Sequence, residues 1–240
     1  FRKISMELMD LSTADEWAVF YQKMIFWELE LESLVDPGMM EIFESQIKEA
    51  NSLFSKFISK SYESWMNDPA AAPELSHTLF KNKVKPLLKE NKPTLLLVID
   101  NLRMDQWKTI EPLLADFYQK EKEESYYSIL PTATQYARNA LFSGCTPLKI
   151  SELYPQWWKN DTNEGGKNLF EKELLQAQLK RLNIGGKMSY HKITNLKNGK
   201  LLAKSLNNHK DEKLTAVVYN FVDMISHAKS EMEIIKELAS

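Results

Sequence analysis

A threonine near the middle of the chain stands where phosphate chemistry would place a nucleophile. The stretch Pro131-Thr132-Ala133-Thr134 follows a short β-like run at 126–130 and precedes a helical pattern that ends at Gly144. A hydroxyl at such a strand-to-helix corner lies beside the unpaired backbone amides of the first helical turn, which favour an anion. The motif predicts either a nucleophile that attacks phosphate or an ordinary helix cap, and it leaves the two alternatives open.

Two aspartates follow apolar runs that are typical of buried strands. Asp100 comes directly after the run at 95–99, and Asp223 follows the run at 215–222, with His227 four residues further on. The carboxyl ends of strands in an open α/β sheet share one edge, so these side chains are expected near Thr134. A carboxylate at that edge needs compensation for its desolvation, which a divalent cation supplies. An aspartate with a histidine is compatible with zinc, although Asp100 as a helix cap and a chance Asp–His pair are the alternatives.

A cation would also correct the chemical weakness of the threonine. A threonine hydroxyl is a poor nucleophile at neutral pH, and a bound cation stabilises its alkoxide. Two cations would hold the entering and leaving oxygens of an in-line phosphoryl transfer. The pattern at 95–103 does not fit two rivals, because Leu102 replaces the second aspartate of haloacid-dehalogenase-type sites and the acidic pair and lysine of a receiver domain cannot be placed. Lys167 is not followed by the hydroxyl residue that a P-loop requires.

The elements that must position these residues divide the chain into three parts. Residues 1–66 predict two long helices joined by a turn at 36–38, with Thr13 and Glu16 spaced as a capping box. This antiparallel hairpin is either a packed helical lobe or a dimerisation and signalling linker. Residues 67–92 are a connecting segment with a short basic helix at 81–91. Residues 93–240 predict an α/β domain with strands at 95–99, 126–130, 187–193 and 215–222 and helices at 104–114 and 171–181.

Composition sets outer limits on the function. The 240 residues are 43% hydrophobic with a formal net charge of -2, which gives no basic field for duplex nucleic acid. The single cysteine, Cys145, excludes an intrachain disulfide and suits a cytoplasmic location, and no apolar run is long enough to cross a bilayer. Trp157 and Trp158 are expected either to pack or to stack on a base. The histidines other than His227 have no such acidic partner in the sequence and are predicted to be ordinary surface or core residues.

Three motifs together resemble a known family. The stretches 97–103 (LVIDNLR), 130–140 (LPTATQYARNA) and 219–228 (YNFVDMISHA) look like the PglZ domain of PorX-type response regulators of the type IX secretion system. This domain is a branch of the alkaline phosphatase superfamily. The helical hairpin is similar to the linker of the same regulators, so the resemblance covers nearly the whole chain. It implies an α/β fold, with an alkaline-phosphatase-like partial sheet and flanking helices preceded by the hairpin.

The resemblance assigns a role to each candidate residue. It implies that Asp100 and Thr134 share one zinc ion, with Thr134 as the nucleophile, and that Asp223 and His227 hold a second. Thr132 becomes a supporting hydroxyl of the motif, and Asn139 is implied to orient substrate oxygens. The implied activity is hydrolysis of phosphodiesters, with cyclic and linear oligonucleotides as substrates.

The resemblance also implies partners, and the sequence departs from the family pattern in two respects. The expected partners are a second copy of the chain under phosphorylation control, an inner-membrane component of the secretion machinery, and a sigma factor. A receiver domain before the hairpin and the family's later Asp-His-Gly motif and last metal histidine are missing from residues 1–240, so 93–240 is expected to be the N-terminal part of a truncated domain. An interaction module with an incomplete site is therefore the alternative to an enzyme.

Overall fold

The computed structural model describes residues 2–34, 36–88, 92–159, 167–220 and 222–225. Its internal contacts divide the chain into two compact units. Residues 1–73 with 103–125 form the first, and residues 74–102 with 126–240 form the second. The segment 103–125 thus belongs by its contacts to the helical unit, although the sequence pattern gave no sign of this. Each unit is described by itself.

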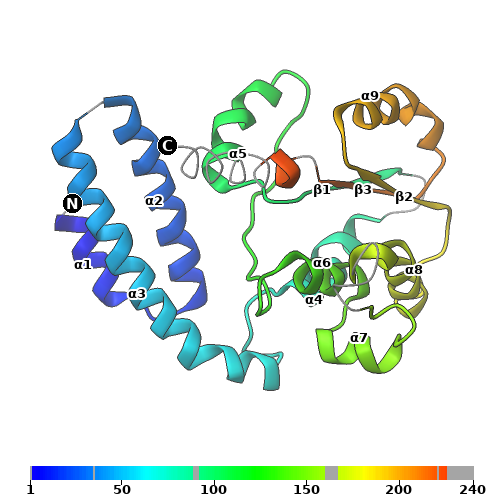
Figure 1. The fold of residues 1–240 in the computed structure, drawn as a ribbon, viewed down its shortest axis with the longest axis horizontal. Coiled ribbons are helices and arrows are strands. Elements are labelled where there is room, and N and C mark those ends of the chain that lie inside the picture. The colour runs from blue at the N-terminus through cyan, green and yellow to red at the C-terminus, as the bar shows by residue number, and fades with distance from the viewer. Residues whose placement is uncertain (1, 35, 89–91, 160–166, 221, 226–240) are drawn as a thin grey trace, which may run out of the picture. The chain divides into compact units, whose positions relative to one another are not determined.

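The first unit is helical (Figure 1). It contains α1 (Arg2–Asp10), α2 (Ala14–Leu34), α3 (Pro37–Asn67) and α5 (Met104–Ile110), and α5 packs against α2. The ring of Trp17, near the start of α2, lies 5.2 Å from that of Phe54 and 5.9 Å from that of Phe57, both late in α3. Contact between the start of one helix and the later half of the next confirms the predicted antiparallel hairpin.

Local capping explains where these helices begin. The Thr13 hydroxyl accepts a hydrogen bond from the Glu16 amide at 3.3 Å, and a Glu16 carboxylate oxygen accepts one from the Thr13 amide at 2.9 Å. This is the predicted capping box, and it satisfies two amides that a helix start leaves unpaired. Asp36 caps α3 by accepting from the amides of Gly38 and Met39, with Pro37 in the first helical turn.

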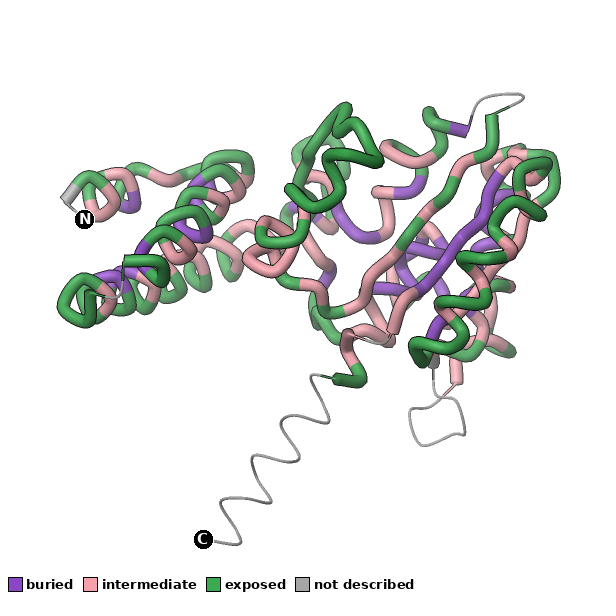
Figure 2. The backbone as a smooth tube through the Cα atoms, turned by 90° about the horizontal axis from the view of Figure 1, so that it is seen from above, coloured by how far each residue is buried: buried purple, intermediate pink, exposed green. Residues whose placement is uncertain are grey.

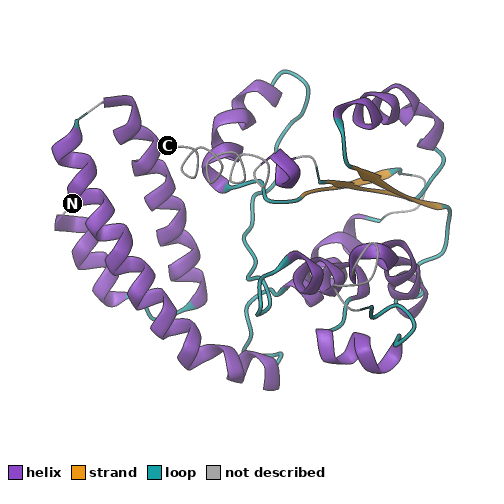
Figure 3. Cartoon of the chain, in the orientation of Figure 1, coloured by secondary structure: helices purple, strands orange, loops and turns teal. Residues whose placement is uncertain are grey.

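The second unit is built on a parallel sheet. Its described strands, orange in Figure 3, are β1 (Thr94–Ile99), β2 (Met188–Ile193) and β3 (Leu214–Tyr219). Their spatial order is β1-β3-β2. The three strands end at the same position along the sheet, because Ile99 and Ile193 both pair with Tyr219 at the carboxyl end. Figure 2 shows β3 as a buried strand between more exposed neighbours. The strands predicted at 95–99, 187–193 and 215–222 are present, the last of them ending three residues early.

Helices flank both faces of this sheet. On one face, α6 (Thr134–Ser143) and α8 (Glu171–Arg181) enclose the core, together with α4 (Ser76–Leu79) and α7 (Pro147–Leu153) (Figure 1). On the other face lies α9 (Leu196–Ser205), where Gly199 permits a close approach to β3: a Cβ there would lie 3.3 Å from the ring of Tyr219. The fully buried members of this core are Phe80, Phe142, Ile150, Leu174, Leu175, Ala216 and Val218. The predicted α/β architecture with flanking helices and a preceding helical hairpin is confirmed.

Two expectations about strands are wrong. The segment 126–130 is a loop and not a strand (Figure 3). Its Tyr127 forms an isolated bridge, in which the Tyr127 amide donates to Glu74 O at 2.8 Å. The segment therefore pairs with residues just before α4 and not with the sheet. The run at 95–99 was expected to be covered on both faces, yet Leu95 and Leu97 are 48% and 50% exposed. Among the described strands β1 lies at an edge and only its Leu96 and Val98 face the core.

The remaining helical segments are single turns of other types. A π turn spans 80–84 and 3₁₀ turns span 85–87, 111–114, 167–170 and 206–209. The basic helix predicted at 81–91 corresponds to the first two of these, and residues 89–91 lie outside the described part. No helix in the described ranges is both long and apolar enough to span a membrane.

Candidate active site

The strand register brings two polar residues together at the carboxyl end of the sheet. Asp100 follows β1 and its amide donates to Tyr219 O at 3.1 Å; Asn220 follows β3 and its amide donates to Ile193 O at 2.8 Å. Because β1 and β3 are parallel and end level with one another, Asp100 and Asn220 occupy neighbouring positions. The carboxyl edge of a parallel sheet is where α/β proteins place their sites.

A buried arginine joins these strand ends to α6. The Arg138 side chain is 5% exposed, and its Nη1 donates to Asp100 Oδ2 at 2.9 Å and to Asn220 Oδ1 at 2.6 Å. The Nε and Nη2 atoms of the same guanidinium donate to the two carboxylate oxygens of Glu171, the second at 3.2 Å. Both edges of the guanidinium are therefore used, and the fork geometry of arginine suits this double contact.

Glu171 is the most deeply buried charge of the site. It opens α8 with no measurable exposure, and it also accepts a hydrogen bond from the Tyr190 hydroxyl at 2.7 Å. Lys192 Nζ lies 3.3 Å from the same carboxylate. Burial raises the pKa of the Tyr190 phenol far above its usual range, and the negative charge of Glu171 acts in the same direction. Tyr190 is therefore a fixed hydrogen-bond donor over the accessible pH range.

The carboxylates influence one another electrostatically. Burial raises the pKa of Asp100 above its usual range; Arg138 opposes the rise, and the negative charges of Asp223 and Glu171 add to it. Asp223 follows β3 in a helical turn at 222–225 and lies close enough to act on Asp100. Lys192 also lies within electrostatic reach of Asp100 and, like Arg138, opposes the rise.

Thr134 is the first residue of α6, and Arg138 follows one turn later on the same side of the helix. The cap position belongs to Ala133 and not to Thr134, so the alternative that Thr134 serves as the helix cap is wrong. Asp100 is no cap either, because α5 begins after Arg103. Gly144 ends α6 in the left-handed region with φ of 63°, as the sequence predicts.

Comparison with known families agrees with this geometry. Residues 79–240 match the model of the BREX system PglZ alkaline phosphatase-like domain. The chain belongs to the PglZ family. Residues 1–66 match the model of the PorX response regulator linker domain, and the predicted resemblance to a PorX-type protein with a PglZ domain is confirmed. No curated protein is detectably similar to the chain. The two matches fit a response regulator with an alkaline phosphatase-like effector.

The PglZ family assignment leaves the roles of individual residues as predictions. Asp100 and Asp223 lie within electrostatic reach of one another, and Thr134 lies one helical turn from the arginine that contacts Asp100. His227 lies outside the described residues. Within the described ranges, no three His, Cys, Asp or Glu side chains are arranged to hold a metal ion. Thr132 is exposed before α6.

Asn139 is fully buried, and its Nδ2 donates to Gln135 O at 2.9 Å. This contact favours a structural role within α6 over the predicted contact with substrate. Sequence reasoning missed Arg138, Glu171 and Asn220. The available signal was an arginine four residues after Thr134, on the helix face that the small apolar residues predict to be buried.

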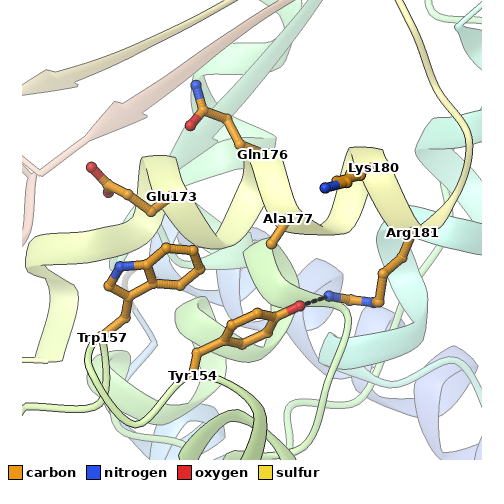
Figure 4. A pocket seen from close by; sticks show the side chains of 7 residues that line it. All are labelled: Tyr154, Trp157, Glu173, Gln176, Ala177, Lys180 and Arg181. Atoms are coloured by element: carbon orange, nitrogen blue, oxygen red, sulfur yellow. Dashed lines mark hydrogen bonds between the residues drawn. The ribbon is translucent and has the colours of Figure 1, made fainter.

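The tryptophans after α7 are partly explained by packing. The Trp157 ring stacks on Tyr154 with centroids 5.0 Å apart, and the Trp158 ring lies 6.0 Å from that of Tyr136. Trp157 and Tyr154 line a hollow of about 430 Å³ along α8, where Arg181 donates to the Tyr154 hydroxyl (Figure 4). Both tryptophans also pack against the core, which favours the packing alternative over base stacking.

Proposed function

We propose that this chain is the effector part of a two-component response regulator that controls type IX secretion, and that it acts as a zinc-dependent phosphodiesterase. The observation that carries the proposal is the hydrogen bond from Arg138 to Asp100, which joins α6, the helix that begins at Thr134, to the carboxyl end of the sheet; Asp223 lies within electrostatic reach of the same Asp100. The match of residues 79–240 to an alkaline phosphatase-like family supports a phosphoester substrate. Cyclic and linear oligonucleotides are the substrate class that we propose.

The chemistry of the donors is compatible with zinc. Asp100 and Asp223 offer carboxylate oxygens within electrostatic reach of one another, and Arg138 contacts Oδ2 of Asp100. In the proposal Asp100 and Thr134 hold one ion, and Asp223 and His227 hold the other. When bound, zinc stabilises the threonine alkoxide and the charge on the phosphate oxygens.

The residues of the chain then account for the two steps of hydrolysis. Thr134 gives up its hydroxyl proton, its Oγ1 forms a bond to phosphorus, and the bond from phosphorus to the leaving ribose oxygen breaks as that oxygen takes up a proton. Water then attacks the phosphothreonine, and the phosphomonoester leaves as Thr134 regains its hydroxyl proton. The amides at the start of α6 lie beside Thr134, where they favour the negative phosphate.

The experiment compares two substitutions at the nucleophile. Thr134→Val removes the hydroxyl with little change of shape, whereas Thr134→Ser keeps it. Turnover of bis(p-nitrophenyl) phosphate and of a cyclic oligonucleotide should fall by orders of magnitude in the valine variant and be largely retained in the serine variant. Because Ala133 and not Thr134 is the cap residue of α6, circular dichroism should be unchanged in both. A valine variant with full turnover contradicts the proposed nucleophile.

The helical unit supports a second candidate, an interaction module. The match of residues 1–66 to a response-regulator linker favours it, and α2 exposes Phe26 and Trp27 to 56% and 45%. Homodimerisation and contacts with an inner-membrane secretion component and a sigma factor belong to this candidate. Zinc content separates the two: two ions per full-length chain support the enzyme, whereas none, with partner binding preserved, supports the module.

A further inference from the structure

The contact between Glu171 and Arg138 is more elaborate than the packing of α6 on α8 requires. Glu171 has no measurable exposure and Arg138 is 5% exposed, so both charges are removed from water. Burying an ion pair is costly, and apolar side chains of similar size often give equal or greater stability at such a place. Stability alone is therefore a weak explanation for this pair.

The packing of α6 on α8 also has its own polar connection. Gln178, on α8 and 1% exposed, donates through Nε2 to Leu141 O and to Phe142 O, each at 2.9 Å. These bonds satisfy carbonyls near the end of α6 without any charged group. The helices are joined at this end by the Gln178 amide and by Arg181, which donates to Ser143 O, whereas Arg138 and Glu171 lie at the end nearer the strand termini.

What the arginine adds is a connection from α8 through α6 to the strand ends. Glu171 holds one edge of the guanidinium, and the other edge contacts Asp100 Oδ2 and Asn220 Oδ1. The hydroxyl of Tyr190, on β2, donates a hydrogen bond to Glu171 and so fixes the position of that carboxylate. Asp100 therefore has one oxygen committed to Arg138, and its rotamer is set before any ligand arrives.

We propose that Arg138, anchored by Glu171, is a positioning residue that holds Oδ2 of Asp100 so that Oδ1 is presented to a divalent cation. This inference rests on the proposed function and deepens it, because it assigns the control of cation affinity to two residues outside the predicted ligand set. Groups that orient a metal-ligating carboxylate typically change metal affinity by about 10- to 100-fold when they are removed. If the contact between Arg138 and Glu171 had only a structural role, removing it would lower the stability of the protein and leave the cation affinity of the folded protein unchanged.

The test is a zinc titration of the intact chain in competition with a chromophoric chelator, with thermal unfolding of the metal-free protein measured in parallel. Arg138→Met should weaken zinc binding about 10- to 100-fold. Arg138→Lys should recover part of the affinity, since it keeps the charge without the two-edged fork. Gln178→Leu is the matched control: it breaks the amide connection between α6 and α8 and leaves Arg138 and Glu171 in place, so it should lower the melting temperature while zinc affinity stays within about threefold, below the effect of a lost orienting group.

A further variant guards against failure to fold. Arg138→Met leaves Glu171 buried without a counterion, whereas Arg138→Met with Glu171→Met removes both charges and should fold. If this double variant, or folded Arg138→Met, binds zinc as tightly as the unchanged chain, the inference is overturned while the proposed function stands. If the unchanged chain binds no zinc, the proposed function fails first and the inference fails with it.

Discussion

Replacing Gly144 by alanine tests whether the end of α6 depends on the close contact with α8. Gly144 has φ of 63°, and a Cβ built there would lie 2.1 Å from Gln178 Oε1 and 2.8 Å from its Cδ. Gln178 is 1% exposed and cannot move into solvent without leaving its two carbonyl acceptors. The substitution therefore combines backbone strain with the loss of a buried side-chain contact.

The magnitude follows from these two effects. A left-handed conformation costs a residue with a Cβ about 1–2 kcal/mol relative to glycine. Displacing Gln178 removes two hydrogen bonds worth about 1 kcal/mol each. We expect the free energy of unfolding of the second unit to fall by about 3–4 kcal/mol.

Urea unfolding followed by circular dichroism measures this loss, with Gly185→Ala as the matched control. Nothing lies within 4 Å of a Cβ at Gly185, so that substitution should change the free energy of unfolding by less than about 0.5 kcal/mol. The reasoning is refuted if Gly144→Ala costs less than about 1 kcal/mol, because strain alone already accounts for that amount. A fall equal to that of the control would show that α6 does not end as described.

Two further predictions concern pH and capping. Burial and then the neighbouring His209 lower the pKa of His191, and burial lowers the pKa of His77, so below about pH 6.5 the unfolded chain binds more protons than the folded one. The melting temperature should therefore fall between pH 7 and pH 5, and His191→Gln should weaken this dependence; an unchanged slope would exclude His191 as its source. Thr13→Ala should lower the stability of the first unit by about 1 kcal/mol in urea unfolding, whereas Thr13→Ser should preserve it.

Local signals in the sequence predicted much of the helical unit. The capping box of Thr13 and Glu16 and the Asp36-Pro37-Gly38 turn act over a few residues, and the structure contains both. The same holds for Gly144, whose left-handed conformation needs only the chain on either side. Such features are encoded where they occur, so a single sequence reveals them.

Strand pairing was harder to predict because it depends on distant partners. The segment 126–130 has the composition of a strand, yet its Tyr127 bridges to Leu75 and not to the sheet. A propensity for extended backbone says nothing about which partner is available. The exposure of Leu95 and Leu97 has the same origin, since an apolar run does not state how many of its faces are covered.

The polar contacts of the second unit were the least predictable part. Arg138 is absent from the predicted site residues, and the burial of a charged helix residue is uncommon. His191 and His209 were predicted to be ordinary, but their rings lie 4.9 Å apart and His209 Nδ1 lies 3.1 Å from Glu212 Oε1. The partners of Arg138 come from different elements and leave no spacing for a sequence pattern to reveal, whereas Glu212 lies only three residues after His209.

The level ends of β1 and β3 have a consequence for how the protein is made. Asp100 and Asn220 are contributed by an early and a late strand of the second unit, and the two meet only when β1 pairs with β3. During synthesis, β1 and α6 leave the ribosome well before β3 does, so a nascent chain holds the threonine and one aspartate without their neighbours. The contacts of Arg138 with Asp100 and Asn220 therefore form only after β3 has docked on β1.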